Sequence, residues 1–292
     1  MVLPGYWRSP LDPERVMQAG VTHWQEHEHQ PREDALSIEE PFEVRIDHRS
    51  LAVIMRTPGN DHELAMGFLY TEKVIVQPED VLSIEDESDA DGLPLANVVN
   101  IALRHRELLD DEQPRQSAVF ERHFAVSASC GLCGKNSIAD LLVTAPCIEQ
   151  GKEDGDDVRF RAATIYELPQ RLRDAQAVFT HTGGVHAAGL FSPTGELLLL
   201  REDVGRHNAV DKIIGHGLLH NDFPYSRHIL MVSGRTSFEI IQKALLARIP
   251  CIAAISAPSS LAVELADSAG ITLIGFLRDH SMNVYTHAER VI

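Results

Sequence analysis

The sequence has few cysteines and no long apolar run. Only four of its 292 residues are cysteine, too few for a disulfide scaffold in a chain of this length and typical of a reducing compartment. No apolar stretch approaches the roughly 18 residues that span a bilayer, and residues 1–20 lack the apolar core of a secretory signal. We therefore expect a cytoplasmic protein that does not associate with membranes.

Basic residues are also scarce. The chain has 26 Lys plus Arg against 43 Asp plus Glu, a formal net charge of −17. This balance disfavours binding to nucleic acid or to anionic lipid, because both attract positive surfaces. An anionic ligand would need a local pocket of basic side chains.

The polarity pattern divides the chain into four segments. Residues 1–38 show no sustained apolar periodicity, which predicts a loosely held polar tail. Residues 39–126 contain a hairpin, a helix and further strands, which favours a small α+β domain, and residues 127–157 carry the cysteine loop and a linker. Residues 158–292 begin with a helix that we expect to have Pro169 in its first turn. A hairpin and alternating helices and buried strands follow, a pattern typical of a three-layer α/β domain.

Cys130 and Cys133 form a CxxC pair with glycine at positions 131 and 134, and three chemistries use such a pair. A structural zinc site needs four ligands, but Cys147 and Cys251 stand alone. A redox dithiol favours a CxxC at a helix start, whereas this loop is rich in glycine. In the third, a mobile thiolate carries a persulfide, and glycines ease its movement. The glycines beside the two cysteines favour the persulfide chemistry, and the zinc and redox alternatives stay open.

A zinc-dependent nucleobase deaminase is a further alternative. Its H-x-E and P-C-x-x-C motifs have a partial counterpart, because His105 and Glu107 precede the cysteine pair. However, Ser129 replaces the proline and the histidine lies in a charged stretch, which disfavours this enzyme. The three histidines within residues 23–29 are typical of a solvated tract, so we expect no metal site.

The cysteine loop and four later segments resemble the FdhD family of formate dehydrogenase accessory sulfurtransferases. The matching segments are Ser127–Lys135, Thr182–His186, Arg201–Lys212, Ser233–Ser237 and Gly275–Arg278. A CxxC pair alone is weak support, but the stretch 202–208 beside it is highly specific. The resemblance extends from about Pro41 to the C-terminus.

The resemblance implies a fold similar to cytidine deaminase, without its chemistry, for the C-terminal domain. It implies that Cys130 accepts persulfide sulfur from a cysteine desulfurase, assisted by Cys133. The sulfur would pass to the molybdenum cofactor, Mo-bis-molybdopterin guanine dinucleotide, bound as a substrate before formate dehydrogenase receives it. Family members of this kind often form homodimers. The resemblance places the cofactor-binding stretch at Phe276, Leu277, Arg278, Asp279, His280 and Ser281.

The residue types in the matching segments suit an anionic dinucleotide independently of the family. Gly183 and Gly184 allow backbone N–H groups to approach a ligand closely. Arg206, Arg235 and Arg278 can offer forked donors to phosphates or to the edge of a pterin. We therefore include these five residues in the predicted cofactor site.

Two simpler explanations accompany these predictions. Glu202, Asp203 and Arg206 could form a structural ion-pair network at a strand end, and His186 and His207 could be hydrogen-bonded histidines of the core. At the level of function, the alternative is a cofactor chaperone that docks on formate dehydrogenase without covalent sulfur chemistry.

Overall fold

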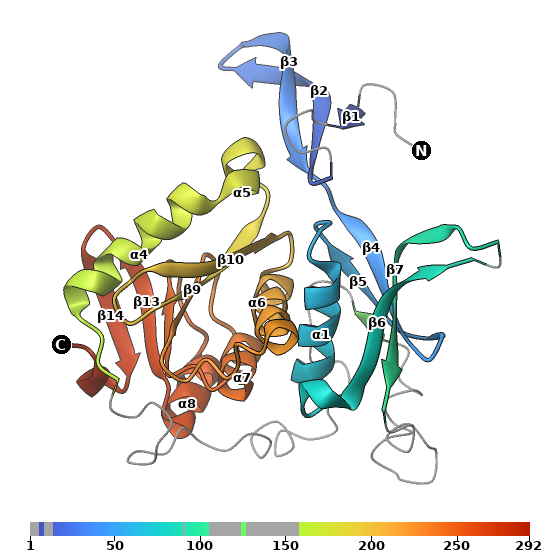
Figure 1. The fold of residues 1–292 in the computed structure, drawn as a ribbon. Coiled ribbons are helices and arrows are strands. Elements are labelled where there is room, and N and C mark those ends of the chain that lie inside the picture. Colours follow the sequence, from blue (N-terminus) through green and yellow to red (C-terminus); the bar gives the residue numbers. More distant parts are fainter. Residues whose placement is uncertain (1–5, 9–13, 90, 105–123, 127–157) are drawn as a thin grey trace.

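The computed structural model describes residues 6–8, 14–89, 91–104, 124–126 and 158–292. In these ranges the chain forms three β-sheets, with helices between the two larger sheets and on an outer face (Figure 1). The expected mixed α/β class is confirmed. Among the described residues, no helix combines the length and the apolarity needed to cross a bilayer.

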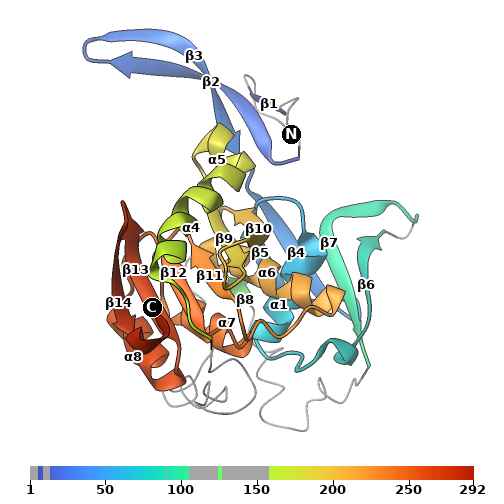
Figure 2. The same ribbon diagram turned by 60° about the vertical axis from the view of Figure 1, so that its left-hand side comes forward.

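A long hairpin near the N-terminus projects from the body of the protein (Figures 1 and 2). Its strands are β2 (Val16–Gln25) and β3 (Glu28–Ser37), and β1 (Tyr6–Arg8) pairs with β2. The predicted loose tail is therefore wrong over residues 16–37. Periodicity could not reveal these strands, because most of their side chains are exposed on both faces and only the foot of the hairpin is buried.

The second sheet has the strand order β6-β7-β4-β5-β8. Its central hairpin packs one face against helix α1, and a short 3-10 helix, η1, precedes β6. The bounds are β4 (Glu40–Ile46), β5 (Arg49–Arg56), α1 (Asp61–Thr71), η1 (Pro78–Asp80), β6 (Val81–Ser88), β7 (Pro94–Leu103) and β8 (Phe124–Val126).

The third sheet has the order β10-β9-β11-β12-β13-β14. Its centre, β11 to β13, is parallel, and the flanking pairs are antiparallel. Every residue of β11 and β12 is buried, as expected for parallel strands covered on both faces. The strands are β9 (His186–Phe191), β10 (Leu197–Asp203), β11 (Ile229–Val232), β12 (Cys251–Ala254), β13 (Thr272–Arg278) and β14 (Ser281–Thr286).

Helices cover the third sheet on both faces. Leu168 and Leu172 of α4 pack on one face, and α6, α7 and α8 pack on the other. Pro169 lies inside α4 rather than in its first turn, because the helix begins earlier than expected and breaks at Gln176. The bounds are α4 (Ala162–Ala175), α5 (Ala177–Thr182), α6 (Arg206–His220), α7 (Phe238–Leu246), α8 (Ser260–Ala269) and η3 (Ala288–Arg290).

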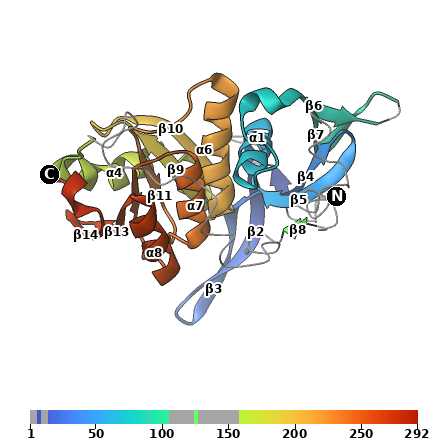
Figure 3. The same ribbon diagram turned by 90° about the horizontal axis from the view of Figure 1, so that it is seen from below.

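Helices α1 and α6 join the two larger sheets into one core (Figures 1 and 3). The two helices meet at Gly67 and Gly215. A Cβ atom on Gly67 would lie 1.9 Å from the backbone oxygen of Asp211, and one on Gly215 would lie 1.8 Å from that of Glu63. Because backbone cannot move aside as a side chain can, only glycine allows this approach. Helix α1 is buried on most of its surface as a result.

Candidate functional site

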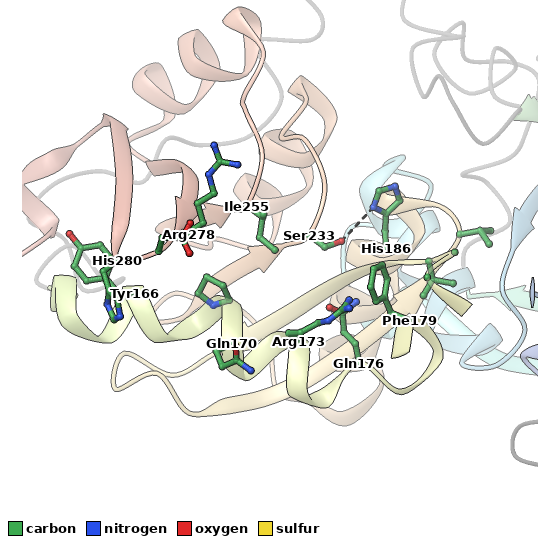
Figure 4. A pocket seen from close by; sticks show the side chains of 16 residues that line it. Tyr166, Gln170, Arg173, Gln176, Phe179, His186, Ser233, Ile255, Arg278 and His280 are labelled. Atoms are coloured by element: carbon green, nitrogen blue, oxygen red, sulfur yellow. Dashed lines mark hydrogen bonds between the residues drawn. The ribbon is translucent and has the colours of Figure 1, made fainter. Parts of the chain in front are cut away.

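A cavity of about 780 Å³ lies along the edge of the third sheet where its parallel strands end. Ser233 and Ile255 follow β11 and β12, and Arg278 ends β13. Helices α4 and α5 form the opposite wall (Figure 4). In α/β proteins, ligands bind beyond the carboxyl ends of parallel strands, and this volume is in the range of about 300–1,000 Å³ that small-molecule pockets have.

The glycine pair predicted for the cofactor site lines this cavity. Gly183 ends α5 with a φ of 65°, a left-handed conformation that glycine adopts without strain. A Cβ atom on Gly184 would lie 2.7 Å from Oγ of Ser37, and this hydroxyl donates to the carbonyl of Gly184 over 3.2 Å. The foot of the projecting hairpin therefore supports the glycine turn.

The predicted stretch 276–281 forms the tip of the β13–β14 hairpin. Arg278 pairs with Ser281, and the two residues between them both have positive φ, 50° for Asp279 and 56° for His280. Positive φ at both central residues is typical of tight hairpin turns, and the turn between β4 and β5 has the same geometry. Arg278, Asp279 and His280 line the cavity.

The other three residues of this stretch lie differently. The side chain of Leu277 is fully buried in the core, so it can offer a ligand only its backbone. Phe276 is 38% exposed and Ser281 is exposed, and neither belongs to the cavity lining. Of the stretch 276–281, only Arg278, Asp279 and His280 therefore line the cavity.

A second arginine, which the sequence did not single out, faces the same cavity. The guanidinium carbon of Arg173 lies 3.9 Å from the ring centroid of Phe179. Neither Arg173 nor Arg278 forms an ion pair with a carboxylate among the described residues. With Asp279 as the one carboxylate of the lining, the two arginines still leave this cavity with a local excess of positive charge in a protein of net charge −17. The cavity can therefore attract an anionic ligand.

Other lining residues also went unrecognised in the sequence. Tyr166, Gln170 and Arg173 share one face of α4, and Tyr166 meets His280 edge to face at 5.8 Å (Figure 4). Their helical spacing was available, but a polar helix face has the same pattern whether it borders solvent or a pocket. Gln176 lies where α4 ends.

His186 occupies one end of the cavity and Ser233 lies beside it. Nδ1 of His186 is 3.4 Å from Oγ of Ser233, which accepts a bond from the backbone N–H of Ala187 over 2.9 Å. Burial lowers the pKa of His186, and the charges of Arg206 and His207 act in the same direction. His186 is therefore neutral at neutral pH and can exchange a proton with a ligand.

Acidification should destabilise the fold through His186 and a second histidine, His228, whose pKa burial also lowers. Because their folded pKa values lie below the ordinary value of 6.5, the unfolded chain binds protons first as the pH falls. The free energy of unfolding should therefore drop as the pH falls through the ordinary histidine pKa, between about pH 7 and pH 5.5. In urea denaturation, the double variant His186→Gln/His228→Gln should lose less stability than the parent over the same range. Equal losses would contradict this assignment.

The two acidic residues of β10 have structural contacts, but the ion-pair network with Arg206 that the simpler explanation proposed does not form among the described residues. Asp203 is fully buried and pairs with Lys212 at 2.7 Å. Both carboxylate oxygens of Glu202 accept backbone N–H bonds, from Val178 at 2.9 Å and Phe179 at 2.8 Å, at the start of α5. These acidic groups hold the walls of the cavity in place.

The remaining predicted basic residues lie outside the cavity lining. Arg206 lies near His186, since a Cβ atom on Gly234 would lie 3.3 Å from the ring of His186 and 3.5 Å from Cδ of Arg206. The Nε of Arg206 is buried without a hydrogen-bond partner in the described structure. Arg235 is exposed. His207 bonds Ser237 at 3.1 Å and also pairs with a carboxylate of α7, so it is a hydrogen-bonded histidine.

The predicted sulfur-carrying residues Cys130 and Cys133 lie outside the described residues, as does Cys147. Cys251 is fully buried in β12, and burial raises the pKa of its thiol to about 12. Cys251 is therefore unreactive, as expected. Within the described ranges, no three His, Cys, Asp or Glu side chains are arranged to hold a metal ion.

Comparisons with known proteins identify the family of the chain. The model of the FdhD/NarQ family matches residues 37–292. The chain is 48% identical over 262 residues to the sulfur carrier protein FdhD of Streptomyces coelicolor, covering 89% of this chain and 90% of that protein. Its identity to the protein of the same name from Sulfurisphaera tokodaii is 46% over 263 residues, covering 89% and 92%.

A solved structure shows the same fold. It is the crystal structure of a chain described as a formate dehydrogenase accessory protein from Desulfotalea psychrophila. The TM-score is 0.71 at 23% sequence identity, and the match covers 95% of this chain and all of that one. At this identity the likeness concerns the fold alone.

Proposed function

Because the chain belongs to the FdhD/NarQ family, we propose that it carries sulfur to the molybdenum cofactor that formate dehydrogenase requires. Relatives that share nearly half of its residues are named sulfur carrier proteins, which supports a role in sulfur transfer. The substrate in this proposal is Mo-bis-molybdopterin guanine dinucleotide, and the donor is the persulfide of a cysteine desulfurase.

One observation carries the proposal for the cofactor. The cavity combines two arginines without carboxylate partners, Arg173 and Arg278, with the backbone of Gly183 and Gly184. Guanidinium groups and close backbone N–H groups are the donors that diphosphates and pterin edges require. A cavity of about 780 Å³ has room for a dinucleotide half of the cofactor.

The proposed sulfur chemistry needs a thiolate at Cys130. The thiolate attacks the outer sulfur of the donor persulfide, the sulfur–sulfur bond of the donor breaks, and the desulfurase cysteine leaves as a thiolate. Cys130 then holds the persulfide. Attack by the Cys133 thiolate on its inner sulfur would release hydrosulfide and leave a disulfide that a cellular thiol must reduce.

The finer structural expectations belong to the same proposal. We assign residues 39–126 and 158–292 to two domains joined by the cysteine segment 127–157, the second of them cytidine-deaminase-like. The helical layers on both faces of the third sheet support the second assignment. We further propose a homodimer that works in the cytoplasm and meets both the desulfurase and formate dehydrogenase there.

Sulfur loading tests the proposal directly. After incubation with a cysteine desulfurase and cysteine, peptide mass spectrometry should find one added sulfur atom on the peptide that contains Cys130. A reducing thiol should remove it, since a persulfide exchanges with thiols. The peptide with Cys251 is an internal control, because its buried thiol should gain nothing. Absence of sulfur on Cys130 would contradict the carrier function.

A further inference from the structure

Several buried polar atoms of the described structure have no hydrogen-bond partner, and among the residues that carry them only Gln176 lines the cavity. It lies where α4 ends and α5 begins, it is only 4% exposed, and it lines the cavity. Its Nε2 has no hydrogen-bond partner. Nearly all buried amide groups in proteins are paired, and because this residue lines the cavity, a ligand bound there is a candidate for the missing acceptor.

The backbone around Gln176 is held firmly. Its carbonyl accepts bonds from the backbone N–H of Thr180 at 3.1 Å and from the hydroxyl of Thr180 at 2.6 Å. Glu202 then fixes the next turn by accepting the N–H groups of Val178 and Phe179. A donor on so fixed a backbone is already oriented before a ligand arrives, which favours selective binding.

A flat wall stands beside this donor. The guanidinium of Arg173 stacks over the ring of Phe179, and Gln176 lies next to them at the end of the cavity that contains His186 (Figure 4). Stacked guanidinium and phenyl groups suit a planar aromatic ring. The combination of a planar wall and an unpaired N–H donor fits a nitrogen heterocycle that bears a ring carbonyl.

We propose that Gln176 donates to the ring carbonyl that guanine and pterin share and adenine lacks, with the heterocycle against Arg173 and Phe179. This inference rests on the proposed function, because the cofactor contains both ring systems. It makes Gln176 the residue that selects an oxo-substituted ring over an amino-substituted one. Adenine would present a donor to the donor of Gln176 and leave both unpaired.

Calorimetric titration of the full-length protein with GDP, IDP and ADP tests the inference. IDP keeps the ring carbonyl of GDP and loses its amino group, so the parent protein should bind GDP and IDP alike and ADP roughly tenfold more weakly. Gln176→Met should weaken GDP and IDP to the level of ADP. Gln176→Glu should prefer ADP, because a carboxylate accepts from an amino group and repels a carbonyl.

Two measurements distinguish a role of Gln176 in selecting the ligand from a role in stabilising the fold. Gln176→Met should melt at or above the temperature of the parent, since it removes an unpaired buried donor, whereas a structural glutamine would lower it. Gln25→Met, on the exposed hairpin, should leave every affinity unchanged. Competition with a free pterin identifies the occupant: if Gln176→Met weakens the pterin but not GDP, the pterin ring occupies this site.

The outcomes also distinguish this inference from the proposed function. If Gln176→Met and Gln176→Glu leave the preference for GDP over ADP and the affinity for pterin unchanged, the inference is wrong and the donor role belongs to water. Sulfur loading on Cys130 would then be unaffected. If the parent binds neither guanine nucleotides nor pterin, the proposed cofactor pocket fails together with the inference.

Discussion

Formate dehydrogenase matured with a Cys130→Ala variant should be inactive, and the loss should be complete rather than partial. A carrier without its thiol cannot form a persulfide, and no other described thiol can replace it, because Cys251 is buried with a raised pKa. The measurement is formate oxidation by dehydrogenase produced in cells that contain only the variant. The variant should still bind GDP with the affinity of the parent, because Cys130 has no role in the proposed nucleotide contacts.

This result separates a carrier from a non-covalent chaperone. A chaperone that only delivers cofactor would retain activity in Cys130→Ala, and such an outcome would overturn the carrier proposal. Cys251→Ala is the matched control, since it removes a thiol from the core and should leave sulfur loading intact. Cys133→Ala should load sulfur normally and release it slowly, because loading needs only the first thiolate.

Much of the third sheet could be predicted because its residues are buried in continuous or regularly spaced runs. The strands β11 and β12 consist entirely of buried residues, and helix α7 between them carries an apolar face. The projecting hairpin could not be predicted in the same way. Strand β3 has no buried residue, so its sequence lacks the alternation of apolar and polar residues that would indicate an inward face.

The candidate site was predictable where it depends on backbone and not where it depends on packing. Gly183 was identified because glycine allows close approach of the backbone to a ligand, whereas Asp279 and His280 were included only through the resemblance of the stretch 276–281 to the family. Arg173 was missed because a polar helix face has the same pattern beside solvent or beside a pocket, and Gln176 was missed because it lies at the break between α4 and α5. A break in a helix depends on tertiary contacts such as those of Glu202, which local sequence does not record.

Replacing Lys212 by methionine should have the largest effect on stability. Lys212 is fully buried, and its Nζ donates to Asp203 at 2.7 Å and to the carbonyl of Thr57 at 2.9 Å. Burial lowers the pKa of Lys212 while Asp203 opposes the shift, so the ion pair is retained against a desolvation cost. Methionine keeps the volume but leaves the Asp203 carboxylate without its cation. Urea denaturation should show a loss of about 3–5 kcal/mol.

The double variant Asp203→Asn/Lys212→Met should recover part of this loss. Asparagine removes the isolated charge, and its carbonyl can still accept from the N–H of Gly205 and from Asn208, which bond Asp203 at 2.8 Å and 2.9 Å. Arg171→Met removes an exposed ion pair with Glu167 and a hydrogen bond to the carbonyl of Gly195, and should cost about 1 kcal/mol. If Lys212→Met costs no more than this control, the buried pair does not hold α6 to the end of β5. That contact connects the third sheet to the second sheet. Without it, the second and third sheets would be joined mainly by the packing of α1 on α6 at their glycines.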